Sequence, residues 1–151
     1  MKEQDSTRKV QVGIVIVTHV DYGAALLRAA EHILGPVSDC VSLQVDINND
    51  VSETVSRLQD AAQRLDSGLG VLVLTDMFGG TPTNLSLSLL GKGELNIEVL
   101  TGVNLPMLLK VLGNREKSIA EMADIACEAG RDGIAIAGEI LRNKVKKSVE
   151  A

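Results

Sequence analysis

The chain has 151 residues, a length typical of one domain, and 45% of them are hydrophobic. Tyr22 and Phe78 are its only aromatic residues, so the core must be built from aliphatic side chains. The scarcity of stacking surfaces and the net charge of −5 both argue against a nucleic-acid partner. The basic residues at 142–147 are interpreted as a solvated end of the chain.

The apolar segments and the two cysteines indicate where the protein is located and whether it binds a metal. No apolar run approaches the roughly 20 residues that span a bilayer, and residues 1–9 lack the apolar segment of a signal peptide. We therefore expect a cytoplasmic protein with no direct membrane insertion. Cys40 and Cys127 lie far apart and form no Cys-x-x-Cys motif, which predicts reduced thiols, no disulfide and no metal site.

The chain alternates between buried strands and helices. Residues 10–17 are almost continuously apolar and β-branched after Gln11, which is typical of a strand buried on both faces. The Ala- and Leu-rich residues 23–34 predict a helix that ends at Gly35 and Pro36. Further strands are expected at 41–47, 71–75 and 97–100, and further helices at 51–65, 83–90, from 104 onward and at 118–129.

Two local features of these segments remain to be placed. Asp50 followed by Glu53 resembles a capping box at the start of the helix 51–65. Residues 134–137 fit either an additional strand or the start of a last helix.

This alternation predicts a single doubly wound α/β domain with a mostly parallel sheet and helices on both faces. We expect a flexible N-terminus at residues 1–9, the domain at 10–140 and a charged tail at 141–151. Ligands of such folds bind beyond the carboxyl ends of the strands, where the strand order reverses. Polar residues follow the carboxyl ends of three of the expected strands, at 18–19, 76–81 and 101–104.

His19 and Asp76 follow the first and third expected strands. A neutral imidazole is a competent nucleophile near pH 7, and it reacts best when an acceptor holds its second nitrogen. In a sheet ordered 2-1-3-4 the first and third strands are neighbours, so Asp76 would face His19. This arrangement predicts phosphoryl transfer through His19 with Asp76 as its partner.

Gly79, Gly80 and Thr81 form a loop suited to holding an oxyanion. Glycines let backbone N–H groups approach a ligand closely, and a following helix start adds partial positive charge. The Thr81 hydroxyl can donate a further hydrogen bond. No Lys or Arg lies in these loops, which suits a carrier that must release its phosphate.

Three motifs in the expected order resemble the mannose-family EIIA domains of the phosphoenolpyruvate-dependent sugar phosphotransferase system. The motifs are IVIVTH at 14–19 followed by AALLRAAE at 24–31, TDMFGGTPTN at 75–84 and GVNLPML at 102–108. The resemblance extends from about residue 10 to residue 138.

The resemblance implies a fold and roles for these residues. His19 would be phosphorylated on Nε2 and Asp76 would be its hydrogen-bonded partner, while Thr81 and the backbone of Gly79 and Gly80 would hold the phosphoryl oxygens. Phospho-HPr would be the donor and a separate EIIB component the acceptor, with no cofactor and no metal. The family also implies a homodimer that exchanges a C-terminal edge strand, here residues 134–137.

One position departs from the family. Gly usually follows the His, whereas this chain has Val20, then Asp21. A β-branched residue at positive φ would be strained by about 1–2 kcal/mol, so we expect a different turn in which Asp21 caps the next helix. Asp21 would also add a negative charge close to the phosphate, which would weaken phosphate retention or alter partner choice.

Two other functions fit parts of this pattern. A regulatory module phosphorylated on His19 but uncoupled from transport would share the same chemistry. A flavodoxin-like module that binds a nucleotide or small anion in the same crevice is less favoured, because the chain has neither Gly-x-Gly-x-x-Gly nor a P-loop motif. An Asp-centred receiver domain is also disfavoured, because its acidic cluster and lysine are missing.

Overall fold

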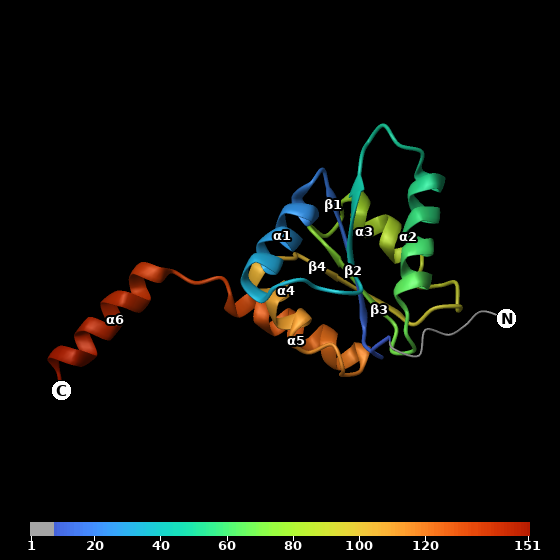
Figure 1. The fold of residues 1–151 in the computed structure, drawn as a ribbon. Helices are drawn as coiled ribbons and strands as arrows, with labels where there is room; N and C mark the ends of the chain where they lie inside the picture. The colour runs from blue at the N-terminus through green and yellow to red at the C-terminus, as the bar shows by residue number, and fades with distance from the viewer. Residues whose placement is uncertain (1–7) are drawn as a thin grey trace.

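The computed structural model describes residues 8–151, so most of the expected flexible N-terminus at residues 1–9 lies outside the described residues. Its centre is a four-stranded parallel sheet in the order β2-β1-β3-β4, which confirms the predicted fold class and strand order (Figure 1). The strands are β1 (Gly13–His19), β2 (Cys40–Val45), β3 (Val71–Thr75) and β4 (Ile97–Thr101).

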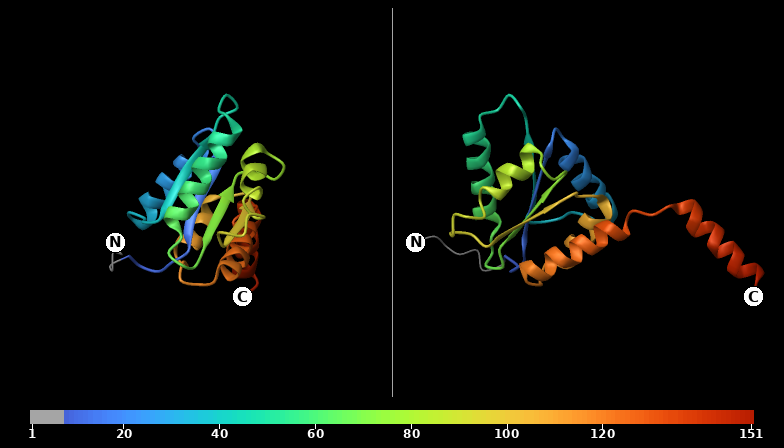
Figure 2. Two further views of the ribbon diagram at one scale, coloured as in Figure 1. Left: turned by 90° about the vertical axis from the view of Figure 1, so that its right-hand side faces the viewer. Right: turned by 180° about the vertical axis from the view of Figure 1, so that it is seen from behind.

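Helices cover both faces of this sheet (Figure 2). The helices are α1 (Tyr22–Leu34), α2 (Val51–Leu65), α3 (Thr81–Leu87), α4 (Leu105–Leu112), α5 (Ile119–Asp132) and α6 (Ala137–Val149). Side chains of α1, α4 and α5 pack on one face, and those of α2 and α3 pack on the other. This three-layer arrangement leaves the carboxyl ends of the strands open for a site.

Alternate residues of the central strands supply the two halves of the core. Ile14 and Ile16 of β1 face α1, α4 and α5, whereas Val15 and Val17 face α2. All four side chains are almost completely buried. The unbroken apolar run in β1 is therefore required because helices cover both of its faces.

Several elements differ from their predicted bounds, and two of these differences concern the ends that carry site residues. β1 runs to His19 rather than ending at residue 17, because Thr18 and His19 still pair with Gln44 and Val45 of β2. α3 begins at Thr81 rather than at residue 83, because Pro82 is accepted in its first turn. Both displacements carry site residues into regular structure, which restricts their motion.

The helix caps differ from those expected. The Asp50 carboxylate accepts from the backbone N–H of Ser52 at 3.0 Å, so it caps α2 without the reciprocal contact of a capping box. A complete capping box occurs instead at α5, where Ser118 and Glu121 each bond to the other's backbone N–H.

The C-terminal segment extends away from the domain (Figure 1). Residues 134–136 adopt neither helix nor strand in the single chain, and α6 then spans the expected boundary between domain and tail at residue 140. Every residue from 131 onward is exposed, including Ile134 at 78% and Ile140 at 48%. Among the described residues, no helix has the length and apolar character needed to cross a membrane.

Candidate functional site

The strand register brings two of the predicted site residues together. Val17 of β1 lies opposite Thr75 of β3, so His19 at the end of β1 and Asp76 just after β3 leave the sheet side by side. This edge is the switch point of the sheet, because the chain moves outward from β1 to β2 and from β3 to β4 in opposite directions.

Asp76 holds His19 at two points. Its Oδ2 atom lies 2.7 Å from the ring Nδ1 of His19 and accepts the backbone N–H of the same residue at 2.9 Å. The other carboxylate oxygen accepts the backbone N–H of Met77 at 3.0 Å. Burial opposes ionisation of the Asp76 carboxyl, but these hydrogen bonds and the nearby His19 ring outweigh it and hold its pKa below the usual value.

The two glycines of the loop serve different geometric purposes. Gly79 has a φ of 80°, which favours glycine, while Gly80 has an ordinary φ of −82°. A Cβ atom on Gly80 would lie 3.0 Å from Cε1 and 3.6 Å from Nε2 of His19. The Gly80 backbone therefore lies close to the Cε1 and Nε2 atoms of the His19 ring.

Thr81 starts α3 and its side chain is exposed beside this loop. The structure thus brings His19, Asp76 and Gly80 together directly, with Thr81 immediately after them. Among residues 8–151, no group of three or more His, Cys, Asp or Glu side chains is placed to hold a metal ion.

Thr83 supports the loop and was not singled out from the sequence. Its buried hydroxyl donates to the carbonyl of Met77 at 2.6 Å and lies 2.7 Å from the hydroxyl of Thr75. These contacts join α3, the loop and the end of β3. The available signal was the position of Thr83 at the end of the Gly-Gly-Thr-Pro-Thr motif, because a hydroxyl that becomes buried there needs a partner.

The polar residues that follow β4, at positions 101–104, have a structural role. The Asn104 side chain caps α4 by accepting from Met107 N at 3.0 Å and donates to the carbonyl of Gly130 at 2.9 Å. The Tyr22 hydroxyl donates to the carbonyl of Val103 at 3.0 Å. This loop therefore braces the start of α1 and the end of α5 beside the site.

The turn after His19 corrects one expectation. Val20 has a φ of 43°, so the chain keeps the left-handed conformation there and does not form a different turn. Asp21 occupies the N-cap position of α1 but makes no side-chain capping hydrogen bond, contrary to the prediction. A β-branched residue in this region is strained by about 1–2 kcal/mol.

The chain is similar in sequence to known proteins of one family. Residues 13–126 match the family described as "EIIA-man: PTS system fructose IIA component". The chain belongs to this EIIA family. It is 32% identical over 125 residues to the PTS system mannose-specific EIIAB component of Escherichia coli (strain K12), covering 82% of this chain and 38% of that protein.

Two further relatives agree with this assignment of the EIIA chain. The PTS system fructose-specific EIIA component of Bacillus subtilis (strain 168) is 29% identical over 105 residues, which covers 70% of this chain and 71% of that protein. The crystal structure of phosphotransferase system component EIIA from Streptococcus agalactiae superposes with a TM-score of 0.77 at 27% identity. That match covers 85% of this chain and 98% of the other. The resemblance to mannose-family EIIA domains is confirmed.

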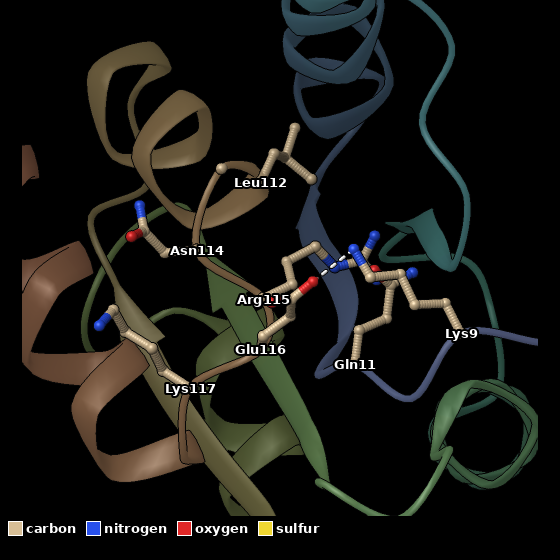
Figure 3. A pocket seen from close by; sticks show the side chains of 8 residues that line it. Lys9, Gln11, Leu112, Asn114, Arg115, Glu116 and Lys117 are labelled. Carbon is tan, nitrogen blue, oxygen red and sulfur yellow. Dashed lines mark ion pairs between the residues drawn. The ribbon is translucent and has the colours of Figure 1, made fainter.

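A hollow in the surface of this EIIA chain lies near the amino ends of the strands, at the end of the sheet opposite His19. It is lined by Lys9, Gln11, Leu112, Gly113, Asn114, Arg115, Glu116 and Lys117, with an ion pair of 2.5 Å between Lys9 and Glu116 (Figure 3). The buried Arg115 guanidinium donates to the carbonyls of Val12, Ser38 and Asp39. These donors tie together the amino ends of β1 and β2, so Arg115 has a structural role.

Proposed function

We propose that this chain is a phosphoryl carrier of the sugar phosphotransferase system, with His19 as the residue that is phosphorylated. The contact between His19 Nδ1 and Asp76 Oδ2 at 2.7 Å carries this proposal. It fixes a tautomer with the proton on Nδ1, so that the lone pair on Nε2 is free to attack phosphorus. Phospho-HPr is the proposed donor and an EIIB component the proposed acceptor, which places the reaction in the cytoplasm.

The transfer exchanges one phosphorus–nitrogen bond for another. His19 Nε2 forms a bond to phosphorus while the bond to the donor's histidine breaks, and the donor's imidazole leaves with the electron pair. Positive charge develops on the His19 ring, and the ionised Asp76 carboxylate stabilises it through the Nδ1 proton. In the second transfer the same ring is the leaving group.

Gly79, Gly80 and Thr81 are proposed to hold the phosphoryl oxygens. Gly80 supports this because its backbone lies close to His19 Nε2, where the phosphoryl group would be attached. The Thr81 hydroxyl is exposed at the start of α3, directly after it. Residues 76–91 contain no Lys or Arg, so hydrogen bonds rather than ion pairs would hold the group and permit its release.

Labelled phosphoenolpyruvate, enzyme I and HPr test the proposal. The chain should acquire an acid-labile, alkali-stable phosphate that is lost in His19→Ala. His32→Ala is the matched control, because His32 is the other histidine of the chain and is exposed on α1. Label that persists in His19→Ala, or no label in the natural chain, would contradict the proposal.

A role in transport and a purely regulatory role share this chemistry. Sugar uptake in a strain that lacks the protein separates them. Uptake that falls on deletion and returns with the natural chain, but not with His19→Ala, supports the transport role. Unchanged uptake in the deletion strain supports the regulatory role.

We also propose a homodimer in which residues 134–137 pair with the partner chain. β4 lies at the edge of the sheet, with one side open to a further strand. Ile134 and Ile136 are 78% and 64% exposed in the single chain, which is unfavourable for apolar side chains unless a partner covers them. Light scattering should give the mass of two chains, and Ile136→Asp should reduce it to one.

A further inference from the structure

Helix α6 has no buried residue and extends away from the rest of the chain (Figure 1). It has 13 residues, and the N-cap residue Ile136 makes no side-chain hydrogen bond to it. An isolated helix of this length is marginal in water, because most helical stability in proteins comes from the packing of one face. Helix α6 therefore needs a surface against which it can pack.

The two sides of α6 differ in polarity. At helical spacing, one face carries four exposed apolar side chains, those of Ile140, Leu141, Val145 and Val149. Arg142 and Lys146 lie one turn apart along a border of this face. Residues 137–151 are net positive, because Lys144 and Lys147 add two further cations and Glu139 and Glu150 are the only acids. A surface that complements α6 is therefore apolar and bordered by carboxylates.

Helix α5 provides a surface of that kind. Exposed acidic side chains recur along it at intervals of three or four residues, so they share one face of the helix. We call them the acidic stripe: Glu121, Asp124, Glu128 and Asp132. Beside the stripe, the half-buried Ile125 and Ala129 line a groove between α4 and α5, with Lys110 and Asn114 on its α4 side. The groove thus pairs apolar side chains with carboxylates.

The position of α5 makes its stripe accessible to a partner chain. In the proposed homodimer, residues 134–137 pair with the partner's β4, so α6 begins beside that strand. Helix α5 packs on β4, and residues of both elements, including Thr101 and Cys127, line one pocket. Helix α3 also contacts β4, but it contains no charged residue. The charged surface nearest to the start of α6 is therefore the partner's acidic stripe.

Two other occupants fit the charges less well. Two α6 helices packed against each other would bring like charges together, because each is net positive. An anionic lipid surface would attract α6 but repel the rest of the chain, which is acidic enough to give a net charge of −5 overall. A second copy of this chain is favoured because its stripe is opposite in sign to α6.

We infer that α6 of one chain docks along the acidic stripe and the adjoining groove between α4 and α5 of its partner. The inference rests on the proposed homodimer and is independent of the chemistry of His19. The apolar face of α6 covers Ile125 and Ala129, and the cations at its border face the carboxylates of the stripe. This contact adds a second interface to the strand pairing at β4.

Charge reversal followed by mixing of chains tests the contact. The variant Asp124→Lys/Glu128→Lys reverses the stripe, and Arg142→Glu/Lys146→Glu reverses α6. In each variant alone, the Kd of the dimer should rise on the order of 10-fold, because like charges then face each other. A mixture of the two variants should restore the natural Kd, since every α6 then meets a partner stripe of opposite sign. Sedimentation velocity over a dilution series measures the Kd.

The matched control is Glu53→Lys/Asp60→Lys, which makes the same change of charge on α2. Both side chains are exposed, and α2 packs on the other face of the sheet. This variant should leave the Kd of the dimer within about twofold of the natural value. Circular dichroism of each variant verifies that the chain is folded.

The outcomes separate the docking of α6 from the proposals on which it depends. An unchanged Kd in both reversed variants would refute the docking and leave the homodimer intact. Recovery only when all four changes are in one chain, and not on mixing, would place α6 on its own chain and also refute it. Sedimentation of the natural dimer with phosphatidylglycerol vesicles would assign α6 to a lipid surface instead. A natural chain that stays monomeric would overturn the homodimer and the docking together, while labelling of His19 would be unaffected.

Discussion

Asp76 Oδ2 accepts both the backbone N–H of His19, at 2.9 Å, and the Nδ1 proton of the same residue, at 2.7 Å. One carboxylate oxygen thus fixes the end of β1 and the orientation of the ring. Because the pKa of Asp76 lies below its usual value, this oxygen is charged throughout the neutral range. The relationship leads to two predictions about Asp76, one for rate and one for stability.

Replacing Asp76 with Asn should slow phosphoryl transfer on the order of 10²-fold, by analogy with the loss of one preorganised electrostatic group. Asn keeps the shape of the side chain but removes the charge that stabilises the phosphorylated ring. Rapid-quench measurement of transfer from phospho-HPr gives the rate. Asp46→Asn changes an exposed carboxylate at the same edge and should leave the rate within about twofold. Unchanged kinetics in Asp76→Asn would remove Asp76 from the mechanism.

Acid should destabilise the natural chain more than Asp76→Asn. The pKa of Asp76 is lower in the folded protein than in the unfolded chain, where it is about 3.9. Its contribution to stability is therefore complete above pH 5 and is lost as the pH falls through the folded value. Urea unfolding between pH 7 and pH 3 measures the difference. A gap between the two proteins that stays constant over this range would contradict the prediction.

Gly80→Ala should impair transfer while leaving the fold intact. The new Cβ would lie 3.0 Å from His19 Cε1 and 3.2 Å from Met77 Cγ, so the ring or the loop must move. A displacement of this kind can cost up to about 10²-fold in rate, and we expect a loss of at least about 10-fold. Gly91→Ala is the control, because a Cβ there meets nothing within 4 Å. Equal transfer rates for the two variants would show that the close approach of Gly80 is unimportant.

Arg115→Lys should destabilise the protein by roughly 2–4 kcal/mol without affecting His19. Lysine cannot donate from a fork to the carbonyls of Val12, Ser38 and Asp39, so buried acceptors lose their partners. Chemical denaturation measures the loss, and transfer below the unfolding transition should match the natural rate. Lys117 is exposed in the same loop, so Lys117→Ala serves as the control and should change the free energy of unfolding by less than about 0.5 kcal/mol. A reduced transfer rate in folded Arg115→Lys would show that the amino ends of the strands, where Arg115 lies, are coupled to the carboxyl ends, where His19 lies.

Local patterns in the sequence were sufficient to predict secondary structure where a residue's environment depends on its neighbours along the chain. Residues 71–74 are all apolar, and the predicted strand at 71–75 forms β3 with the predicted bounds. The amphipathic pattern at 51–65 likewise matches α2. Ser118 and Glu121 have the spacing of a capping box, so the cap of α5 could also have been read from the sequence.

The turn at Val20 shows why other features could not be predicted in this way. The sequence favoured a different turn there, because a β-branched residue resists positive φ. The structure imposes a φ of 43° because Asp76 and Thr18, both outside the turn, bind its two ends. The conformation at Val20 thus depends on Asp76, which binds the neighbouring His19 from 57 positions further along the chain.

By itself the sequence determined the elements, the parallel α/β class and the polar residues at the strand exits, because hydrophobic periodicity and turn residues act locally. The tertiary structure alone decided the contact between His19 Nδ1 and Asp76 Oδ2, and the approach of Gly80 to the ring. It also decided that Val20, Met77 and Phe78 are exposed around the site. These depend on the register between β1 and β3, which is fixed by the packing of two helical layers on one sheet and not by any single segment.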